Sequence, residues 1–260
     1  MAGIAKRRNR YAILRRLTPI VAVLLTCTLA WQAGAAWSGL PDFILPEPAT
    51  VLARFAGALA DGSLLRHTGY TLVEVLAGML LGMSAAAVLG YLLGKSRLAE
   101  RVLSPYIVAS QAIPTVAIAP LLMIWLGTGL LSKVLICALI VFFPVLVNTV
   151  VGLRSVSASL RELMRSLGAS RAQTFRLLEL PAAMPVLLGG LKVGATLSVI
   201  GAVVGEFVGA DRGLGFLINV ARGQYDTALV FVGVFTLVAM ALTLYGLVAL
   251  AEARFLSWRD

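Results

Sequence analysis

The sequence predicts an all-α integral membrane protein with six membrane-spanning helices, and the composition carries most of that prediction. The 260 residues are 60% hydrophobic and only 13% charged, and the mean hydropathy is +0.94. A soluble domain typically has about one-quarter charged residues. A chain with so few charges lacks the polar surface that water requires, so we expect a bilayer to be its solvent.

Apolar stretches of the right length are the second observation behind this fold class. A membrane-crossing helix needs about 20 apolar residues. Links rich in glycine, proline and charge separate the candidates. The six predicted spans are residues 17–38, 70–94, 102–126, 132–153, 183–209 and 226–250.

The elements follow in order along the chain. We expect a basic cytoplasmic N-terminus at 1–16, the first span at 17–38, an external loop at 39–64, a core at 65–255 containing a loop at 160–181, and a cytoplasmic tail at 256–260. The external loop carries three prolines and an amphipathic segment over 48–60, which predicts a surface helix. Ala33-Gly34-Ala35 also permits signal-peptide cleavage after the first span, which would leave five spans.

Charge placement orients the predicted helices. The net charge is +10. With the N-terminus inside, 16 of the 22 basic residues fall in the cytoplasmic segments, including the loop at 154–176. This distribution follows the positive-inside rule, whereas a nucleic-acid-binding protein would gather its basic residues on one exposed face. We therefore expect contact with membrane lipids and none with nucleic acid.

Small residues recur at every third or fourth position in the second and fifth spans. Such ridges let a neighbouring helix backbone approach closely. We favour packing within the chain over a dimer seam as their purpose. The two ridges comprise Gly78, Gly82, Ala86, Gly90 and Gly94, and Gly190, Gly194, Ser198, Gly201, Gly205 and Gly209.

Sites for a nucleotide, metal or disulfide find little support. The segment 90–96, GYLLGKS, is one residue too short for a phosphate-binding P-loop and ends an apolar helix. Cys27 and Cys137 lie in apolar runs without metal-ligand spacing, and His67 is the single histidine. We expect a chain that binds no cofactor and catalyses no reaction itself.

Polar residues inside the spans are candidates for a translocation pathway. They are Gln111, Pro114, Trp125, Asn148 and Glu206. Charges in hydrocarbon are costly, so Glu74, Lys192 and Glu206 must face protein or water. For Glu206, a pathway or gate role and an interhelical hydrogen bond or ion pair stay equally open. Lys192 is expected to extend towards the cytoplasmic side.

The segment 162–181 is a polar island between two apolar spans. Leu160, Leu163, Met164 and Leu167 share one face of a short predicted helix. Gly168 can then adopt a left-handed turn, and Ser170 can cap a second helix over 170–178 that ends at Pro181. The result is a helix–turn–helix suited to a groove on a soluble partner.

The spacing in this island resembles the EAA loop of ABC importer permeases. Glu162, five residues, Gly168, nine residues, and then Leu178-Glu179-Leu180-Pro181 match that pattern, with Leu163 and Met164 in place of two alanines. The resemblance implies a type I importer permease fold with cytoplasmic coupling helices. It assigns ATPase coupling to Glu162, Leu163, Met164, Gly168, Ala169, Leu180 and Pro181.

The resemblance also implies partners and location. It predicts two cytoplasmic ABC ATPase subunits that bind ATP and Mg, an external solute-binding protein, and a second permease copy in a homodimer. The complex would lie in the bacterial inner membrane, with both termini of this chain in the cytoplasm.

Four stretches of the sequence narrow the branch of this family. Segments 111–134 and 142–153 are similar to the nitrate, sulfonate and taurine permeases. Segments 162–170 and 199–215 are most similar to importers of thiamine-precursor pyrimidines or riboflavin. A vitamin or vitamin precursor is the preferred solute, and sulfonate, taurine or nitrate the alternative. An ion-coupled secondary transporter, a membrane enzyme and a structural subunit are the rival classes.

Overall fold

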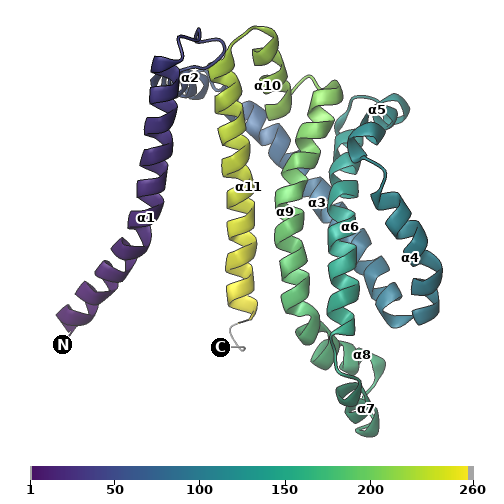
Figure 1. Cartoon of the computed structure of the whole chain (residues 1–260). Helices are drawn as coiled ribbons and strands as arrows, with labels where there is room; N and C mark the ends of the chain where they lie inside the picture. The colour runs from purple at the N-terminus through teal and green to yellow at the C-terminus, as the bar shows by residue number, and fades with distance from the viewer. Residues whose placement is uncertain (1, 257–260) are drawn as a thin grey trace.

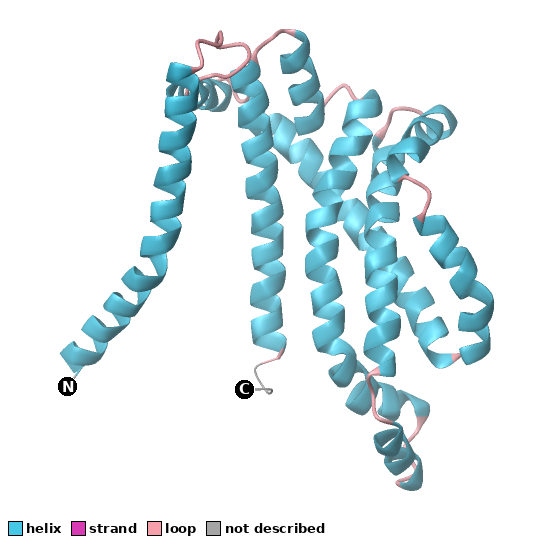
Figure 2. Ribbon diagram, viewed as in Figure 1, coloured by secondary structure: helices cyan, strands magenta, loops and turns pink. Residues whose placement is uncertain are grey.

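The computed structural model describes residues 2–256, and the regular elements among them are all helical (Figure 2). The chain begins with α1 (Ala2–Trp37) and a loop, followed by the short helix α2 (Pro48–Ala60). The helix predicted over 48–60 is therefore present with those bounds. The tail predicted at 256–260 lies, apart from residue 256, outside the described residues.

Three long helices form the centre of the molecule. They are α3 (Ser63–Lys95), α6 (Leu130–Arg154) and α9 (Leu180–Gly209), and α6 packs against both others. The helix α11 (Thr227–Phe255) lies on the other side of α9, and α10 (Leu214–Gly223) packs against α9 and α11 (Figure 1).

The two glycine ridges explain how closely these helices pack. A Cβ on Gly82 of α3 would lie 2.5 Å from the carbonyl oxygen of Ala138, and one on Gly201 of α9 would lie 2.8 Å from Cα of Cys137. Both neighbours belong to the backbone of α6. The ridges therefore serve packing within the chain, with α6 held between them.

The third predicted span is wrong as a single helix. Its residues form α4 (Arg97–Gln111) and α5 (Thr115–Leu126), which meet at 88°. Pro114 lies at the break. Proline has no N–H to donate and disfavours helical geometry in the residue before it, so the helix ends there and restarts.

Among the described residues, four helices are long and apolar enough to cross a membrane. They are Ser63–Lys95, Leu130–Arg154, Arg171–Gly209 and Thr227–Phe255, and the bent α4–α5 pair could make a fifth. The apolar segment Val21–Trp37 of α1 is shorter. This segment contacts the rest of the molecule near its C-terminal end, where the indole of Trp31 stacks on Phe231 at 5.1 Å.

The short helices α7 (Ala158–Ser166) and α8 (Arg171–Thr174) project from one end of the bundle (Figure 1). We call this the loop end. At the opposite end lie α10, the start of α3 and the start of α6.

Candidate functional site

The projecting segment is a well-capped helical hairpin, which we call the coupling loop (residues 158–181). Its first helix, α7, ends in a Schellman motif: the Ala169 N–H donates to the Met164 carbonyl at 3.0 Å and the Gly168 N–H to the Arg165 carbonyl at 2.9 Å. Gly168 has φ +68°, a left-handed conformation that residues with a side chain resist. The predicted role of Gly168 in the turn is confirmed.

The second helix of the loop begins as predicted at Ser170. Its hydroxyl accepts from the Gln173 N–H, and the Gln173 side chain accepts from the Ser170 N–H at 2.8 Å, which makes a capping box. These reciprocal bonds satisfy donors that a helix start leaves free. The loop is thus fixed by backbone geometry at both sides of its turn.

The prediction that Pro181 ends this second helix is wrong. The chain continues from α8 through a π-helical turn, η1 (Phe175–Glu179), directly into α9. In that turn the Leu180 N–H donates to the Phe175 carbonyl, five residues back. Pro181 follows where the chain returns to α geometry, so its missing N–H does not interrupt the helix.

The tip of the coupling loop is apolar and exposed. The side chains of Leu163 and Leu167 are 53% and 71% exposed, and Leu160 is 46% exposed. Glu162 and Gly168 are exposed beside them, while Met164 and Ala169 are half-buried. A short helix that presents leucines outward beyond the ends of the spans is suited to a protein groove.

Leu180 and Pro181 belong to a different place. Both are half-buried in the first turn of α9, below the projecting tip. The residues predicted for coupling therefore fall into two groups, with Glu162, Leu163, Met164, Gly168 and Ala169 at the tip and Leu180 and Pro181 at the base.

A buried carboxylate at the base was missed by the sequence analysis. Glu179 is 1% exposed, and its Oε1 accepts from Lys95 Nζ at 2.5 Å and lies 3.7 Å from Arg161 Nε. These three residues come from η1, α3 and α7, so they join the coupling loop to two central helices. An acidic residue directly before Leu-Pro, where the chain enters an apolar span, was the available signal.

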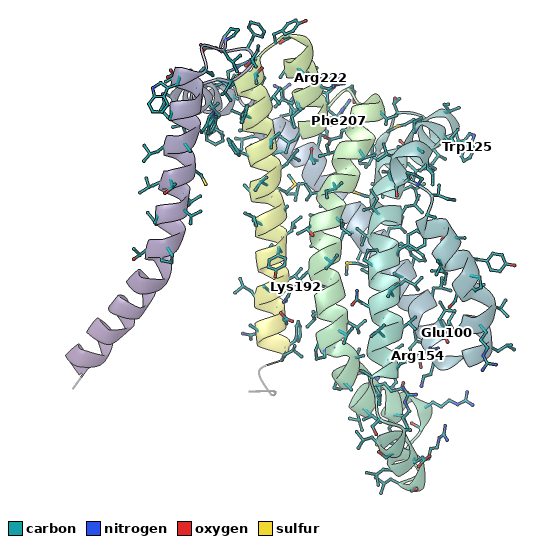
Figure 3. The ribbon with its side chains drawn as sticks, viewed as in Figure 1. Glu100, Trp125, Arg154, Lys192, Phe207 and Arg222 are labelled. Carbon is teal, nitrogen blue, oxygen red and sulfur yellow. The ribbon has the colours of Figure 1, made fainter. Side chains whose placement is uncertain are left out.

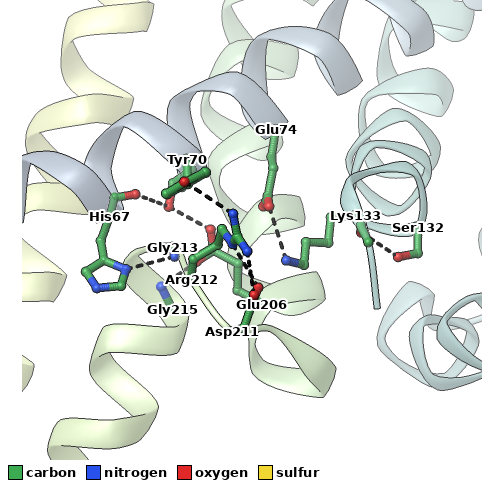
Figure 4. Close-up of polar contacts among 12 residues, drawn as sticks. His67, Tyr70, Glu74, Ser132, Lys133, Glu206, Asp211, Arg212, Gly213 and Gly215 are labelled. Atoms are coloured by element: carbon green, nitrogen blue, oxygen red, sulfur yellow. Dashed lines mark hydrogen bonds and ion pairs between the residues drawn. The ribbon is translucent and has the colours of Figure 1, made fainter. Parts of the chain in front are cut away.

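A second polar cluster lies at the opposite end of the bundle (Figure 4). Glu206 of α9 accepts from the Thr71 hydroxyl at 2.6 Å through Oε1 and from the Gly215 N–H through Oε2. The N–H of Leu214 donates to the Thr71 hydroxyl at 2.8 Å. Glu206 thereby ties the turn after α9 to α3, which is the interhelical hydrogen-bonding role left open for it.

Glu206 shares this cluster with a buried ion pair. Lys133 Nζ of α6 lies 3.4 Å from Glu74 Oε1 of α3, and both side chains are 3% exposed. Glu206 interacts electrostatically with both. The sequence indicates Glu74 and Glu206 as candidates but not the lysine that they share. Glu74 and Lys133 are 59 positions apart, so no local pattern predicts their pairing.

At the exposed rim of this cluster, Arg212 forms a bidentate contact with Asp211 at 3.0 and 2.6 Å and donates to the Tyr70 hydroxyl at 3.2 Å. The hydrogen bonds from the Arg212 guanidinium lower the pKa of Asp211 to about 2. The carboxylate therefore stays charged at any physiological pH.

The other pathway candidates do not gather around Glu206. Asn148 donates to the Pro144 carbonyl of its own helix at 2.8 Å and packs against Gly190 of α9. Trp125 is 70% exposed and points outward from α5 (Figure 3). Pro114 lies at the α4–α5 break, and the side chain of Gln111 lies outside the described part of the structure.

Comparison with known proteins identifies the family to which this chain belongs. Residues 78–257 match the family model described as "Binding-protein-dependent transport system inner membrane component". The chain belongs to this family. It is a multi-pass inner-membrane permease of an ABC importer that works with an ATPase and a binding protein, and in this family ATP is bound by the ATPase.

Individual relatives agree with this assignment. The permease is 50% identical to the riboflavin transport system permease protein RibX of Chloroflexus aurantiacus, covering 92% of this chain and 89% of that protein. It is 33% identical to the formylaminopyrimidine transport permease protein ThiX of Halalkalibacterium halodurans, covering 94% and 96%.

A solved structure supports the fold. The crystal structure of an amino acid ABC transporter with histidines matches with a TM-score of 0.55 at 21% identity, covering 78% of this permease and 96% of that chain. The predicted ABC permease fold is confirmed for the overall arrangement of the chain. The family membership excludes a secondary transporter, an enzyme and a purely structural subunit.

Proposed function

We propose that this permease imports a flavin or a related uncharged heterocyclic vitamin, delivered by an external binding protein. The main support for this solute is the 50% identity to a riboflavin permease over nearly the full length of both chains. The relative ThiX is named for the transport of formylaminopyrimidine, which is also a nitrogen heterocycle.

Electrostatics in the spans supports an uncharged solute. Of the described residues, the two lysines at interior span positions are already paired: Lys133 with Glu74, and Lys192 with Glu252. Lys192 lies between α9 and α11 (Figure 3), and its pairing with Glu252 joins the two helices near the C-terminal end of α11. A sulfonate or nitrate would favour a free cation along its route.

In the proposed complex, two permease copies form a homodimer, and each coupling loop docks into one ATPase. The positive-inside distribution of basic residues supports a cytoplasmic position for the coupling loop and both termini. In this arrangement α1 supplies the first of six spans and the bent α4–α5 pair the third. Glu162, Leu163, Met164, Gly168 and Ala169 contact the ATPase, and Leu180 and Pro181 anchor the base.

Uptake by the complete transporter tests the solute. The permease would be reconstituted with its ATPase and binding protein in proteoliposomes, and labelled riboflavin and taurine would be supplied with and without ATP. We expect ATP-dependent riboflavin uptake and none of taurine. Uptake of taurine alone would overturn the proposed solute, and riboflavin uptake without the ATPase would overturn the proposed coupling.

A further inference from the structure

A cationic cavity of about 610 Å³ lies at the loop end, between the last turns of α3 and α6 and the start of α7. Four basic side chains line it, together with one carboxylate, that of Glu162. The four are Lys95, Arg154, Arg161 and Arg165. We call this the basic cavity.

Neighbouring carboxylates neutralise only part of this charge. Lys95 pairs with Glu179, and Arg154 pairs with Glu100 of α4. Arg161 shares Glu179 with Lys95 through its Nε and donates to the Leu153 carbonyl through Nη2. A planar guanidinium offers paired donors that match the oxygens of a phosphate. Lys95 and Arg161 share one carboxylate, so the basic cavity keeps an excess of positive charge of the kind that binds phosphate.

Arg165 supplies a guanidinium group that is unpaired among the described residues. Its side chain is exposed on α7, and the described part of the structure gives it neither a hydrogen bond nor an ion pair. It lines the same cavity as Arg161. Two guanidinium groups from one short helix can thus reach a single anion.

A second cavity, of about 330 Å³, lies next to the first and has an almost wholly apolar lining. It lies between α3, α6 and the start of α9. Its walls are Ala87, Val88, Tyr91, Leu92, Thr149, Leu153, Phe175, Leu180, Ala183 and Leu187. We call this the apolar cavity.

Aromatic contacts join the two cavities. Lys95 Nζ of the basic cavity lies 5.6 Å from the ring centre of Tyr91, which lines the apolar cavity. Tyr91 meets Phe175 edge to face at 5.2 Å. Tyr91 and Lys95 are one helical turn apart on α3, about 6 Å along the axis. An amphiphile can therefore reach both cavities at once.

From this juxtaposition we infer that the permease binds an anionic phospholipid at the loop end. Its phosphate lies in the basic cavity, and part of an acyl chain lies in the apolar cavity. Basic pockets between helices at the membrane surface are suited to such head groups. A free phosphate would use the basic cavity alone and would leave the apolar one without a role. The inference depends neither on the transported solute nor on the ATPase docking proposed above.

Native mass spectrometry of the full-length permease in detergent tests the inference. The delipidated protein would be titrated with phosphatidylglycerol and with phosphatidylcholine of identical acyl chains. We expect tighter binding of phosphatidylglycerol and about fivefold weaker binding in Arg165→Gln, since one basic residue near a lipid surface accounts for about that factor. Arg171→Gln, an exposed arginine of the same loop outside the cavity lining, is the matched control.

A second pair of variants tests the acyl-chain half. Ala87→Trp fills the apolar cavity and should weaken phosphatidylglycerol binding, whereas Ala85→Trp, exposed on the same helix outside that lining, should not. Both positions are exposed, so size-exclusion chromatography should show all variants monodisperse.

Three results would overturn the proposal. They are equal affinity for the two lipids, unchanged phosphatidylglycerol binding in both Arg165→Gln and Ala87→Trp, and displacement of the lipid by free glycerol phosphate at equal concentration. The last result would identify a soluble-anion site instead of a lipid site.

Discussion

The α3–α6–α9 bundle holds a lysine beside a glutamate near each of its ends, and the two pairs differ in their access to solvent. At the loop end the Lys95 side chain is 40% exposed beside a buried Glu179. At the opposite end Lys133 and Glu74 are both 3% exposed, with Glu206 next to them. At the loop end the lysine reaches water although its carboxylate does not, whereas at the opposite end neither member of the pair reaches water.

This difference separates a movable end from a fixed one. A lysine that reaches solvent loses little when its partner shifts, because water replaces the contact. A buried pair that loses one member leaves an uncompensated charge. We expect motion to be cheap at the base of the coupling loop and expensive around Glu206. The following substitutions test that contrast, from the largest expected effect to the smallest.

Lys133→Leu should have the largest effect. It leaves the buried carboxylates of Glu74 and Glu206 without their shared lysine, at a cost of about 3–5 kcal/mol. The thermal unfolding of the purified permease in detergent should shift to markedly lower temperature. The double variant Lys133→Leu/Glu74→Leu should recover part of the loss. If the single variant is as stable as the original, the fixed end does not depend on this pair.

Gly82→Leu tests the contact between α3 and α6 that lies between the two ends. Its side chain would force α3 away from the Ala138 carbonyl, at a cost of about 1–3 kcal/mol or more. Gly246→Leu on α11 is the control, because a Cβ there meets nothing within 4 Å. Thermal unfolding measured on both variants should separate them clearly. Equal losses would contradict close packing at Gly82.

Gly168→Ala should strain the turn of the coupling loop by about 1–2 kcal/mol, because alanine resists a φ of +68°. Asparagine tolerates that region, so Gly168→Asn should retain most of the function. Solute-stimulated ATP hydrolysis by the reconstituted transporter measures both. Space does not explain a loss, since a Cβ at this glycine meets nothing within 4 Å. Equal ATP hydrolysis by the two variants would show that the backbone conformation of Gly168 does not determine coupling.

Glu179→Gln should have the smallest effect on stability, at about 1 kcal/mol or less. The side chains of Lys95 and Arg161 are 40% and 30% exposed, so water can solvate both cations, and the amide oxygen can still accept the hydrogen bond from Lys95. Thermal unfolding beside Lys133→Leu gives the comparison. A loss as large as that of Lys133→Leu would show that the loop end is as fixed as the other end.

Local signals in the sequence predict much of this molecule. The apolar stretches give the central helices to within a few residues at several of their ends, and Gly168 and Ser170 give the turn and cap of the coupling loop. The glycine ridges predict close packing. Each of these rests on residues close together in the chain, where periodicity and capping chemistry apply.

What the sequence does not reveal depends on distant residues or on competing local effects. Glu179 and Lys95 are 84 positions apart, so their pairing has no local signature. Pro114 breaks a helix, whereas Pro181 does not. A π-helical turn precedes Pro181, so the missing N–H of this proline falls in the first turn of α9 and does not interrupt the helix. The same residue type thus has two outcomes that only the surrounding backbone decides.

Cross-linking between the permease and its ATPase tests most directly the claim that the coupling loop is the docking element. Single cysteines at Leu163 and at Tyr225, which is 73% exposed near α10, would be introduced into permease lacking Cys27 and Cys137. The complete transporter would then be treated with a short bifunctional reagent. We predict a cross-link to the ATPase from position 163 and none from position 225. A cross-link from 225, or none from 163, would contradict the account.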